Sequence, residues 1–288
     1  MRRMKKMNIN LLKVNCSSIC SIMANAKDNR PLSEKQWDEV RDYLDREKPL
    51  TDRQCVILKE YLLKESKYNP QKLGNGIKAD LIKMYSWFVY GKGSIGASTY
   101  ENLATEKGTV QESQSIKLLS QYDGINYRKN EKRYQNRFIT GYPDIVVSRK
   151  GVKKVIDIKT PIDINSFFYK HEIELPNEYL YQMRGYIELT KADYGEVAFC
   201  LVNLPPEMIA QEIRKLKQRY FLFGKSDEET AIRVQQLEDS MIFDDIPIER
   251  RIIKFTVNRD EDFMKTVYER VKIAKAWMKE FHKKSAHL

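Results

Sequence analysis

Cysteine and histidine are scarce in this sequence, and long apolar runs are absent. Four cysteines and three histidines occur among 288 residues. Only Cys16 and Cys20 lie close together, so the sequence offers neither a disulfide framework nor a second cysteine pair for a zinc site. No stretch approaches the roughly 18 apolar residues of a membrane-spanning helix. We therefore expect a cytoplasmic protein from a reducing compartment, without a membrane partner.

The N-terminal segment needs a separate interpretation. MRRMKKMN is basic, and LLKVNCSSICSIMANA partly matches the apolar segment and cleavage site of a signal peptide. Lys13, Asn15, Ser17 and Ser18 interrupt the apolar segment. We interpret it as part of the folded protein.

Charge and aromatic content describe the class of protein. Lys and Arg number 51 against 40 Asp and Glu, a net charge of +11, and aromatic residues make up 11%. The aromatic content excludes a disordered chain. The positive charge favours a polyanionic partner, which is nucleic acid or a membrane surface.

The first third of the chain has helical signals. Capping boxes begin at Ser33 and Thr51, where a glutamine follows three residues later, and a third apolar stripe ends at Gly91. GKGSIGAS, residues 91–98, is typical of a loop or linker. We therefore predict a helical N-terminal lobe over residues 1–98, packed on a core formed by residues 99–288.

Strand patterns alternate with helices after residue 98. The predicted helices span 106–121, 177–190, 206–223 and 226–241, and a long amphipathic helix ends the chain. The predicted strands span 125–128, 137–141, 144–149, 152–159, 196–204 and 250–257. This order predicts an α/β (α+β) core with a central sheet flanked by helices.

A predicted hairpin holds the most informative residues. If Lys150 and Gly151 form its turn, Asp144 lies opposite Asp157, and Lys159 shares a strand face with Asp157. Two opposed carboxylates repel each other unless that face is solvated or a cation lies between them. Hard oxygen ligands favour Mg²⁺, Mn²⁺ or Ca²⁺. A solvated polar face remains the alternative.

The segment pattern resembles a known family. GYPDIV and VIDIKTP resemble the signature of PD-(D/E)XK nucleases, with Pro143-Asp144 followed by Asp157-Ile158-Lys159. EYLYQMRGYIELT resembles the Q-x-x-x-Y motif of the RecB-like and lambda-exonuclease-like (YqaJ-type viral recombinase) branches, through Gln182 and Tyr186. KGTVQESQSI resembles the first motif of this branch. NCSSICSIMAN resembles its opening serine motif, and the last strand and helix also fit.

The resemblance implies a restriction-endonuclease-like fold with a mixed sheet, and a role for each matching residue. The metal ligands would be Glu112, Asp144, Asp157 and the backbone carbonyl of Ile158. Lys159 would orient or deprotonate the attacking water, with Gln182 and Tyr186 supporting Lys159 or the DNA backbone. One or two Mg²⁺ ions, replaceable by Mn²⁺, would be the cofactor, because such ions activate water and neutralise phosphate oxygens.

Further basic residues are candidates for DNA contact. NYRKNEKRYQNRF interleaves cations with aromatic residues, a pattern that suits phosphates and unstacked bases. Its basic residues are Arg128, Lys129, Lys132, Arg133 and Arg137. Ser17 and Ser18 of the opening motif join them, although Lys13 and Asn15 stand where the family pattern predicts an arginine. A solvated loop is the alternative interpretation.

The resulting hypothesis is a Mg²⁺-dependent DNA exonuclease, acting 5′ to 3′ on duplex DNA in phage recombination or end resection. It would work in the cytoplasm, which is the host cytoplasm if the protein is phage-encoded. A single-strand annealing protein is a possible partner, and the chain could form a homo-oligomer. The alternatives are a restriction-like endonuclease and a non-catalytic DNA-binding module. Related nucleases with an iron–sulfur cluster need three C-terminal cysteines. Cys200 is the last cysteine here, so we expect no cluster.

Overall fold

The computed structural model describes residues 12–25, 29–91 and 103–285. The chain divides into two compact units. One comprises residues 1–10, 21–93 and 267–288, and the other comprises residues 11–20 and 94–266. The expected linker at 91–98 lies, apart from Gly91, outside the described residues, so the boundary at residue 98 stays a prediction. No helix of the described part is long and apolar enough to span a membrane.

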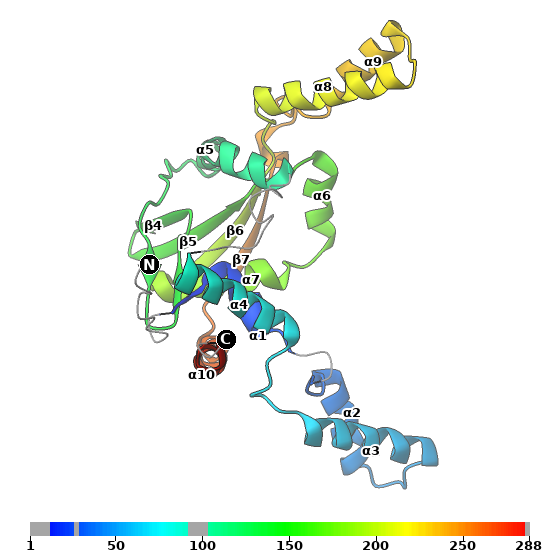
Figure 1. Cartoon of the computed structure of the whole chain (residues 1–288), viewed down its shortest axis with the longest axis vertical. Helices are drawn as coiled ribbons and strands as arrows, with labels where there is room; N and C mark the ends of the chain where they lie inside the picture. Colours follow the sequence, from blue (N-terminus) through cyan, green and yellow to red (C-terminus); the bar gives the residue numbers. More distant parts are fainter. Residues whose placement is uncertain (1–11, 26–28, 92–102, 286–288) are drawn as a thin grey trace. The chain divides into compact units, whose positions relative to one another are not determined.

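A mixed four-stranded sheet forms the centre of the second unit (Figure 1). Its order is β4 (Ile145–Arg149), β5 (Val152–Lys159), β6 (Tyr194–Cys200) and β7 (Ile252–Asn258). β5 and β6 run parallel, while both outer pairs are antiparallel. The predicted α/β class and mixed sheet are confirmed.

A smaller sheet joins the N-terminal segment to this unit. β3 (Ile139–Gly141) pairs with β1 (Val14–Asn15) in parallel and with β2 (Tyr134–Gln135) in antiparallel orientation. The strand predicted at 125–128 is wrong. Those residues form a loop in which Tyr127 is buried, because its hydroxyl bonds Asp123 and its ring packs with the core.

The β4–β5 hairpin has the predicted register. Ile145 lies opposite Ile156, and Arg149 lies opposite Val152. The two turn residues, Lys150 and Gly151, have φ angles of 51° and 81°. Positive φ at both positions is the geometry of a two-residue turn whose twist matches the strands. The register sets Asp144 and Asp157 at the next opposed positions, at the open end of the hairpin.

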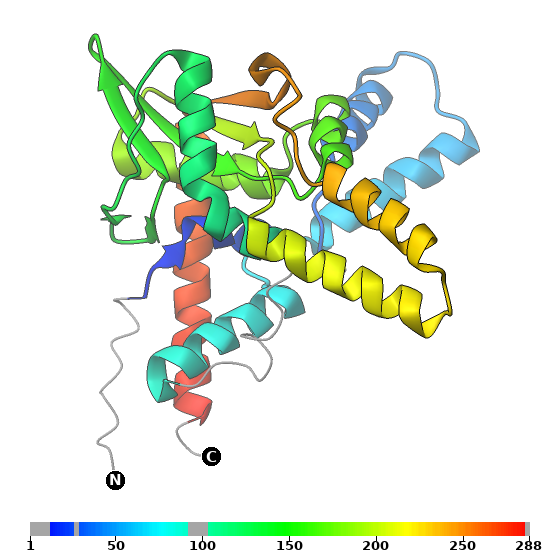
Figure 2. The same cartoon turned by 90° about the horizontal axis from the view of Figure 1, so that it is seen from above.

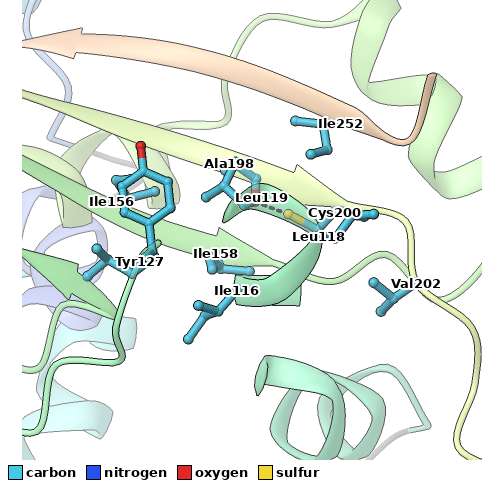
Figure 3. Close-up of a cluster of buried hydrophobic side chains, with 11 residues drawn as sticks. Ile116, Leu118, Leu119, Tyr127, Ile156, Ile158, Ala198, Cys200, Val202 and Ile252 are labelled. Carbon is cyan, nitrogen blue, oxygen red and sulfur yellow. Dashed lines mark hydrogen bonds between the residues drawn. The ribbon is translucent and has the colours of Figure 1, made fainter. Parts of the chain in front are cut away.

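Two helices cover the two faces of this sheet. α5 (Leu103–Asp123) packs on the face formed by Ile156, Ile158 and Ala198, and its side chains enter the buried cluster shown in Figure 3. α7 (Asn177–Thr190) packs on β5 and β6 through Met183, which lies against Gly195. The alternation along β5 therefore turns Asp157 and Lys159 away from the α5 cluster. A helix that the sequence patterns missed, α6 (Ile164–Glu172), precedes α7.

Two further helices of this unit form a hairpin. α8 (Pro206–Leu222) and α9 (Asp227–Asp239) pack on each other and run in opposite directions (Figure 2). Ser226 caps α9 through the predicted capping box with Glu229. A short turn, η3 (Ile248–Arg250), leads into β7.

The other unit is helical, as predicted. It contains α2 (Glu34–Asp45), α3 (Asp52–Lys67), α4 (Asn75–Tyr90) and most of α10 (Glu261–Ser285). The capping boxes at Ser33 and Thr51 are present, and Gly91 ends α4 with a φ of 65°. Arg270 of α10 is buried and donates hydrogen bonds to the carbonyls of Ile22, Ala24 and Pro70, which ties α10 to this unit. A short helix, α1 (Ile19–Met23), connects the two units in sequence.

Candidate active site

Two carboxylates meet at the open end of the β4–β5 hairpin. Asp157 is 3% exposed, and Asp144 is partly buried. The backbone N–H of Ile158 donates a 2.6 Å hydrogen bond to Oδ2 of Asp144. The hairpin thus fixes the Asp144 carboxylate against the strand that carries Asp157.

Burial and mutual repulsion alter the titration of this pair. Burial raises the pKa of Asp144 to about 7, and the nearby charge of Asp157 adds to the effect. Burial also raises the pKa of Asp157, although Lys159 acts in the opposite direction. Carboxylates that are costly to ionise are stabilised by a cation, so this pair offers a site for one.

Lys159 is the nearest cation to this pair. Its Nζ lies 2.7 Å from Oδ2 of Asp157, yet that oxygen is buried and has no hydrogen bond of good geometry. Burial by itself lowers the pKa of Lys159, but Asp157 and Asp144 raise it above its usual value overall. Lys159 is therefore an ammonium group in this arrangement.

α7 supplies the residues that surround Lys159. The Oε1 of Gln182 lies 3.5 Å from Nζ of Lys159, and the Nε2 of Gln182 donates to the hydroxyl of Tyr186 at 2.9 Å. The ring centre of Tyr179 lies 4.8 Å from the same Nζ. The Q-x-x-x-Y pair is thus assembled beside Lys159, and Tyr179 extends it by one turn. The Q-x-x-x-Y motif assigns no role to Tyr179, although its position one turn before Gln182 places it on the same face of α7.

Glu112 lies close enough for its charge to raise the pKa of Asp144 and Asp157. Its Oε2 nevertheless bonds Nζ of Lys129 at 2.5 Å. Lys129, predicted as a DNA contact, is therefore the partner of a predicted metal ligand. The buried Ile116 and Leu119 follow Glu112 at four and seven residues, so Glu112 lies on the side of α5 that packs inward.

The residues at the open end of the hairpin are the candidate ligands for a divalent metal. Among the described residues, no three His, Cys, Asp or Glu side chains are grouped as a ready metal site. The donor chemistry nevertheless fits a hard cation, because a buried and a partly buried carboxylate oppose each other and Oδ2 of Asp157 lacks a hydrogen bond. Ile158 contributes its backbone at the same point, while its side chain lies in the core.

The opening serine motif packs beside the same helix. η2 (Cys16–Ser18) contacts α7 and β3, and the buried Cys16 lies close to Gly141 and Gly185. A Cβ on Gly185 would come within 2.9 Å of the Cys16 sulfur. Ser17 and Ser18 lie in η2 with exposed and partly exposed side chains. The sequence motif draws attention to the two serines, but it does not reveal that Cys16 packs closely against Gly141 and Gly185.

The basic segment lies between α5 and β3. Arg128 and Lys132 are exposed, and Lys132 lies 5.2 Å from the ring centre of Tyr134. Arg133 is anchored, because its Nε donates to the Thr140 hydroxyl at 2.8 Å. Arg137 lies over the ring of Phe138. The segment therefore does alternate cations with aromatic rings. Arg133 already bonds within the protein, whereas Arg128 and Lys132 are exposed to other molecules.

Solved structures resemble this arrangement over nearly the whole chain. A phage-related exonuclease from Haemophilus somnus 129PT matches with a TM-score of 0.61 and 25% identity, covering 96% of this chain and 100% of the other. The chain has the PD-(D/E)XK nuclease fold of the lambda-exonuclease-like branch. This confirms the family resemblance that the motifs suggested.

A second exonuclease supports the same PD-(D/E)XK fold at lower identity. The alkaline exonuclease LHK-Exo from Laribacter hongkongensis matches with a TM-score of 0.54 and 13% identity, covering 96% of this chain and 95% of the other. Its complex with dAMP matches with a TM-score of 0.51 at the same identity and coverage. No protein-family model matches the chain, and no curated protein matches it.

Proposed function

We propose that this protein is a metal-dependent DNA exonuclease that degrades duplex DNA in the 5′ to 3′ direction. The observation that carries the proposal is the meeting of Asp144, Asp157 and Lys159 at one strand end, in a chain that has the fold of exonucleases. LHK-Exo has been crystallised with dAMP, a deoxynucleoside monophosphate. Such a monophosphate is the chemical unit that exonucleolytic cleavage of DNA releases.

In this proposal Asp144, Asp157 and the Ile158 carbonyl hold one or two Mg²⁺ or Mn²⁺ ions, with Glu112 as a further ligand. A bound divalent ion lowers the pKa of a water ligand and neutralises phosphate oxygens. Lys159 carries a positive charge beside the pair, which suits it to hold the water and to stabilise charge that develops on the phosphate.

Gln182 and Tyr186 act as positioning residues. The Gln182 amide lies between the lysine and the tyrosine hydroxyl, so it restricts where the ammonium group can point. Tyr186 is 4% exposed, which keeps this hydrogen-bonded row rigid. Ser17, Ser18 and the free basic residues after α5 would bind DNA phosphates.

A biological setting follows from the same proposal. The similar Haemophilus somnus structure is described as phage-related. We infer a role in phage recombination or end resection in the cytoplasm of the host. A single-strand annealing protein would be a fitting partner, since it would use the exposed strand, and a homo-oligomer would fit a processive enzyme.

One assay tests the activity and its direction. Linear duplexes labelled at either end, with and without a 5′ phosphate, are incubated with Mg²⁺ or with EDTA. We expect loss of the 5′ label first, only with Mg²⁺. Closed circular DNA is included as a control: its cleavage would favour a restriction-like endonuclease. Absence of hydrolysis under all metal conditions would leave a DNA-binding module.

A further inference from the structure

The most exposed of the large apolar side chains among the described residues lie together at one point of the α8–α9 hairpin. Phe221, Leu222 and Phe223 are 84%, 74% and 74% exposed. They lie at the end of α8, before Gly224 turns the chain towards α9 with a φ of 62°, and we call these three residues the tip of the hairpin. Three adjacent exposed apolar residues mark a surface that contacts another molecule.

The charges around this tip indicate the chemistry of that molecule. The side chains of Arg214, Lys217 and Arg219 of α8 are exposed and have no hydrogen-bond or ion-pair partner in the described part of the chain. Other cations of the hairpin are engaged, since Lys215 bonds Glu212 and Lys225 pairs with Glu229.

Helical spacing puts two of the free cations beside the tip. Arg214, Lys217 and Phe221 follow one another at intervals of three and four residues, so they share one face of α8. The inner face carries Ile213 and Tyr220, which are partly buried, and Tyr220 accepts a bond from Arg233 of α9. The acidic first turn of α9 lies on the other helix. The unpaired cations of the hairpin therefore lie on α8, whereas Arg233 of α9 is bonded to Tyr220 and Gln236.

A cavity lies at the base of α8, at the opposite end of this helix from the exposed apolar residues. It has a volume of about 450 Å³. Gln111, Gln114 and Gln121 of α5 line it, together with Arg251. Arg251 is largely buried and pairs with Asp244 at 3.2 Å, while its Nε has no hydrogen-bond partner. Gln111 directly precedes Glu112, so α5 carries both a residue of this cavity and a candidate metal ligand.

We propose that the α8–α9 hairpin and the cavity at its base bind single-stranded DNA. Free cations would neutralise phosphates, the glutamine amides would bond phosphates and bases, and the exposed phenylalanines would stack on unpaired bases. This inference rests on the proposed function in taking DNA as the substrate, and it assigns the hairpin to the strand that is left unpaired.

Three variants of the full chain test the inference. The first, called the arm variant, replaces the unpaired cations of α8 and carries Arg214→Gln, Lys217→Gln and Arg219→Gln. The tip variant carries Phe221→Ser and Phe223→Ser. The control variant carries Lys35→Gln, Arg53→Gln and Lys59→Gln, three exposed cations of the helical unit. The arm and control variants lower the net charge of +11 by the same amount.

Fluorescence anisotropy in EDTA measures binding to a labelled oligo(dT) of about 20 nucleotides, which exceeds the few to about 16 nucleotides of a typical single-strand site. We expect the arm variant to bind at least tenfold more weakly than the control variant, with a salt slope reduced by about two. The tip variant should lose at least about thirtyfold in affinity, since it removes two aromatic rings and each stacked base contributes about 1–3 kcal/mol.

Two results would overturn the inference. One is equal oligo(dT) binding by the arm and control variants. The other is a concentration-dependent dimer of the wild type that the tip variant abolishes while oligo(dT) affinity is unchanged, which would make the tip a protein interface. Binding is read without metal, so a failure of hydrolysis by the wild type would contradict the proposed function and leave this result standing.

Discussion

The backbone N–H of Ile158 donates a 2.6 Å hydrogen bond to the Asp144 carboxylate across the open end of the β4–β5 hairpin. Ile158 of β5 thus fixes a carboxylate that lies directly before β4, while its side chain anchors β5 in the core beneath α5. The site is held by the register of a two-residue hairpin. Its geometry is therefore coupled to the most regular part of the fold.

The first prediction concerns Lys159. Lys159→Ala should abolish hydrolysis while leaving DNA affinity nearly unchanged, because one lysine adds little to a net charge of +11 but lies 2.7 Å from Asp157. Single-turnover cleavage and anisotropy, measured on the same preparation, separate the two effects. The matched control is Lys265→Ala, whose side chain is 74% exposed. If the Lys159 variant cleaved DNA at the same rate as the control variant, the assignment of Lys159 to the active site would be wrong.

Much of the sheet could be predicted from local rules. The hairpin register followed from Lys150-Gly151 alone, and the alternation along β5 then separated Asp157 from Ile156 and Ile158. The helices α7 and α8 lie within one residue of their predicted bounds. These signals are short in range, so they survive without knowledge of the tertiary structure.

Other features depend on contacts between distant segments. The ion pair of Lys129 with Glu112 joins two residues that the sequence assigned to different tasks. The loop around Tyr127 contains strand-forming residues but is held by a hydroxyl bond to Asp123. Such pairings arise only when the sheet brings the segments together, so no local pattern announces them.

A second prediction tests the close packing of the N-terminal segment. Gly185→Ala should destabilise the protein by about 1–3 kcal/mol, because its Cβ would lie 2.7 Å from Ile19 and 2.9 Å from Cys16. Gly108→Ala is the matched control in α5, where a Cβ meets no atom within 4 Å. That variant should gain about 0.5–1 kcal/mol from helix propensity. Urea denaturation of both variants measures the difference, and equal stabilities would contradict the packing.

A third prediction concerns the basic segment after α5. Arg128→Gln with Lys132→Gln should weaken binding to duplexes of every sequence and reduce the salt slope by about two. Both side chains are exposed, whereas Arg133 is bonded to Thr140 and would confound the result by destabilising the loop. The Lys35→Gln, Lys59→Gln double variant has the same change in charge. If the two double variants have the same salt slope, DNA does not bind along the basic segment after α5.

The titration of Asp144 gives a fourth prediction, for the metal-free protein. Burial, and then the charge of Asp157, raises the pKa of this carboxyl from 3.8 to about 7. Between these values the folded state binds more protons than the unfolded state, so stability should fall as the pH rises from about 4 to about 7 and then level off. Asp157 has the same sign. Denaturation in EDTA across this range measures the slope, and stability that rises throughout would contradict the buried pair.

The last prediction separates a metal site from a polar sheet face. At a pH of about 8, above the pKa of Asp144, ionisation of both carboxyl groups is costly in the metal-free protein, although the Lys159 ammonium lies beside Asp157. Asp144→Asn removes one of these charges and keeps the amide oxygen as an acceptor for the Ile158 N–H. The metal-free variant should therefore be as stable as the wild type or more stable, by up to a few kcal/mol.

With saturating Mn²⁺ or Mg²⁺ the order should reverse. A cation that binds only the folded state stabilises it by mass action, and the variant has lost a charged oxygen ligand, so its gain from metal should be smaller than that of the wild type. Thermal melts of both proteins, in EDTA and in Mn²⁺, give the two differences. Opposite signs require a cation between the carboxylates, since a solvated polar face would respond to neither metal nor charge removal in this way. An equal gain from metal in both proteins would exclude Asp144 as a ligand.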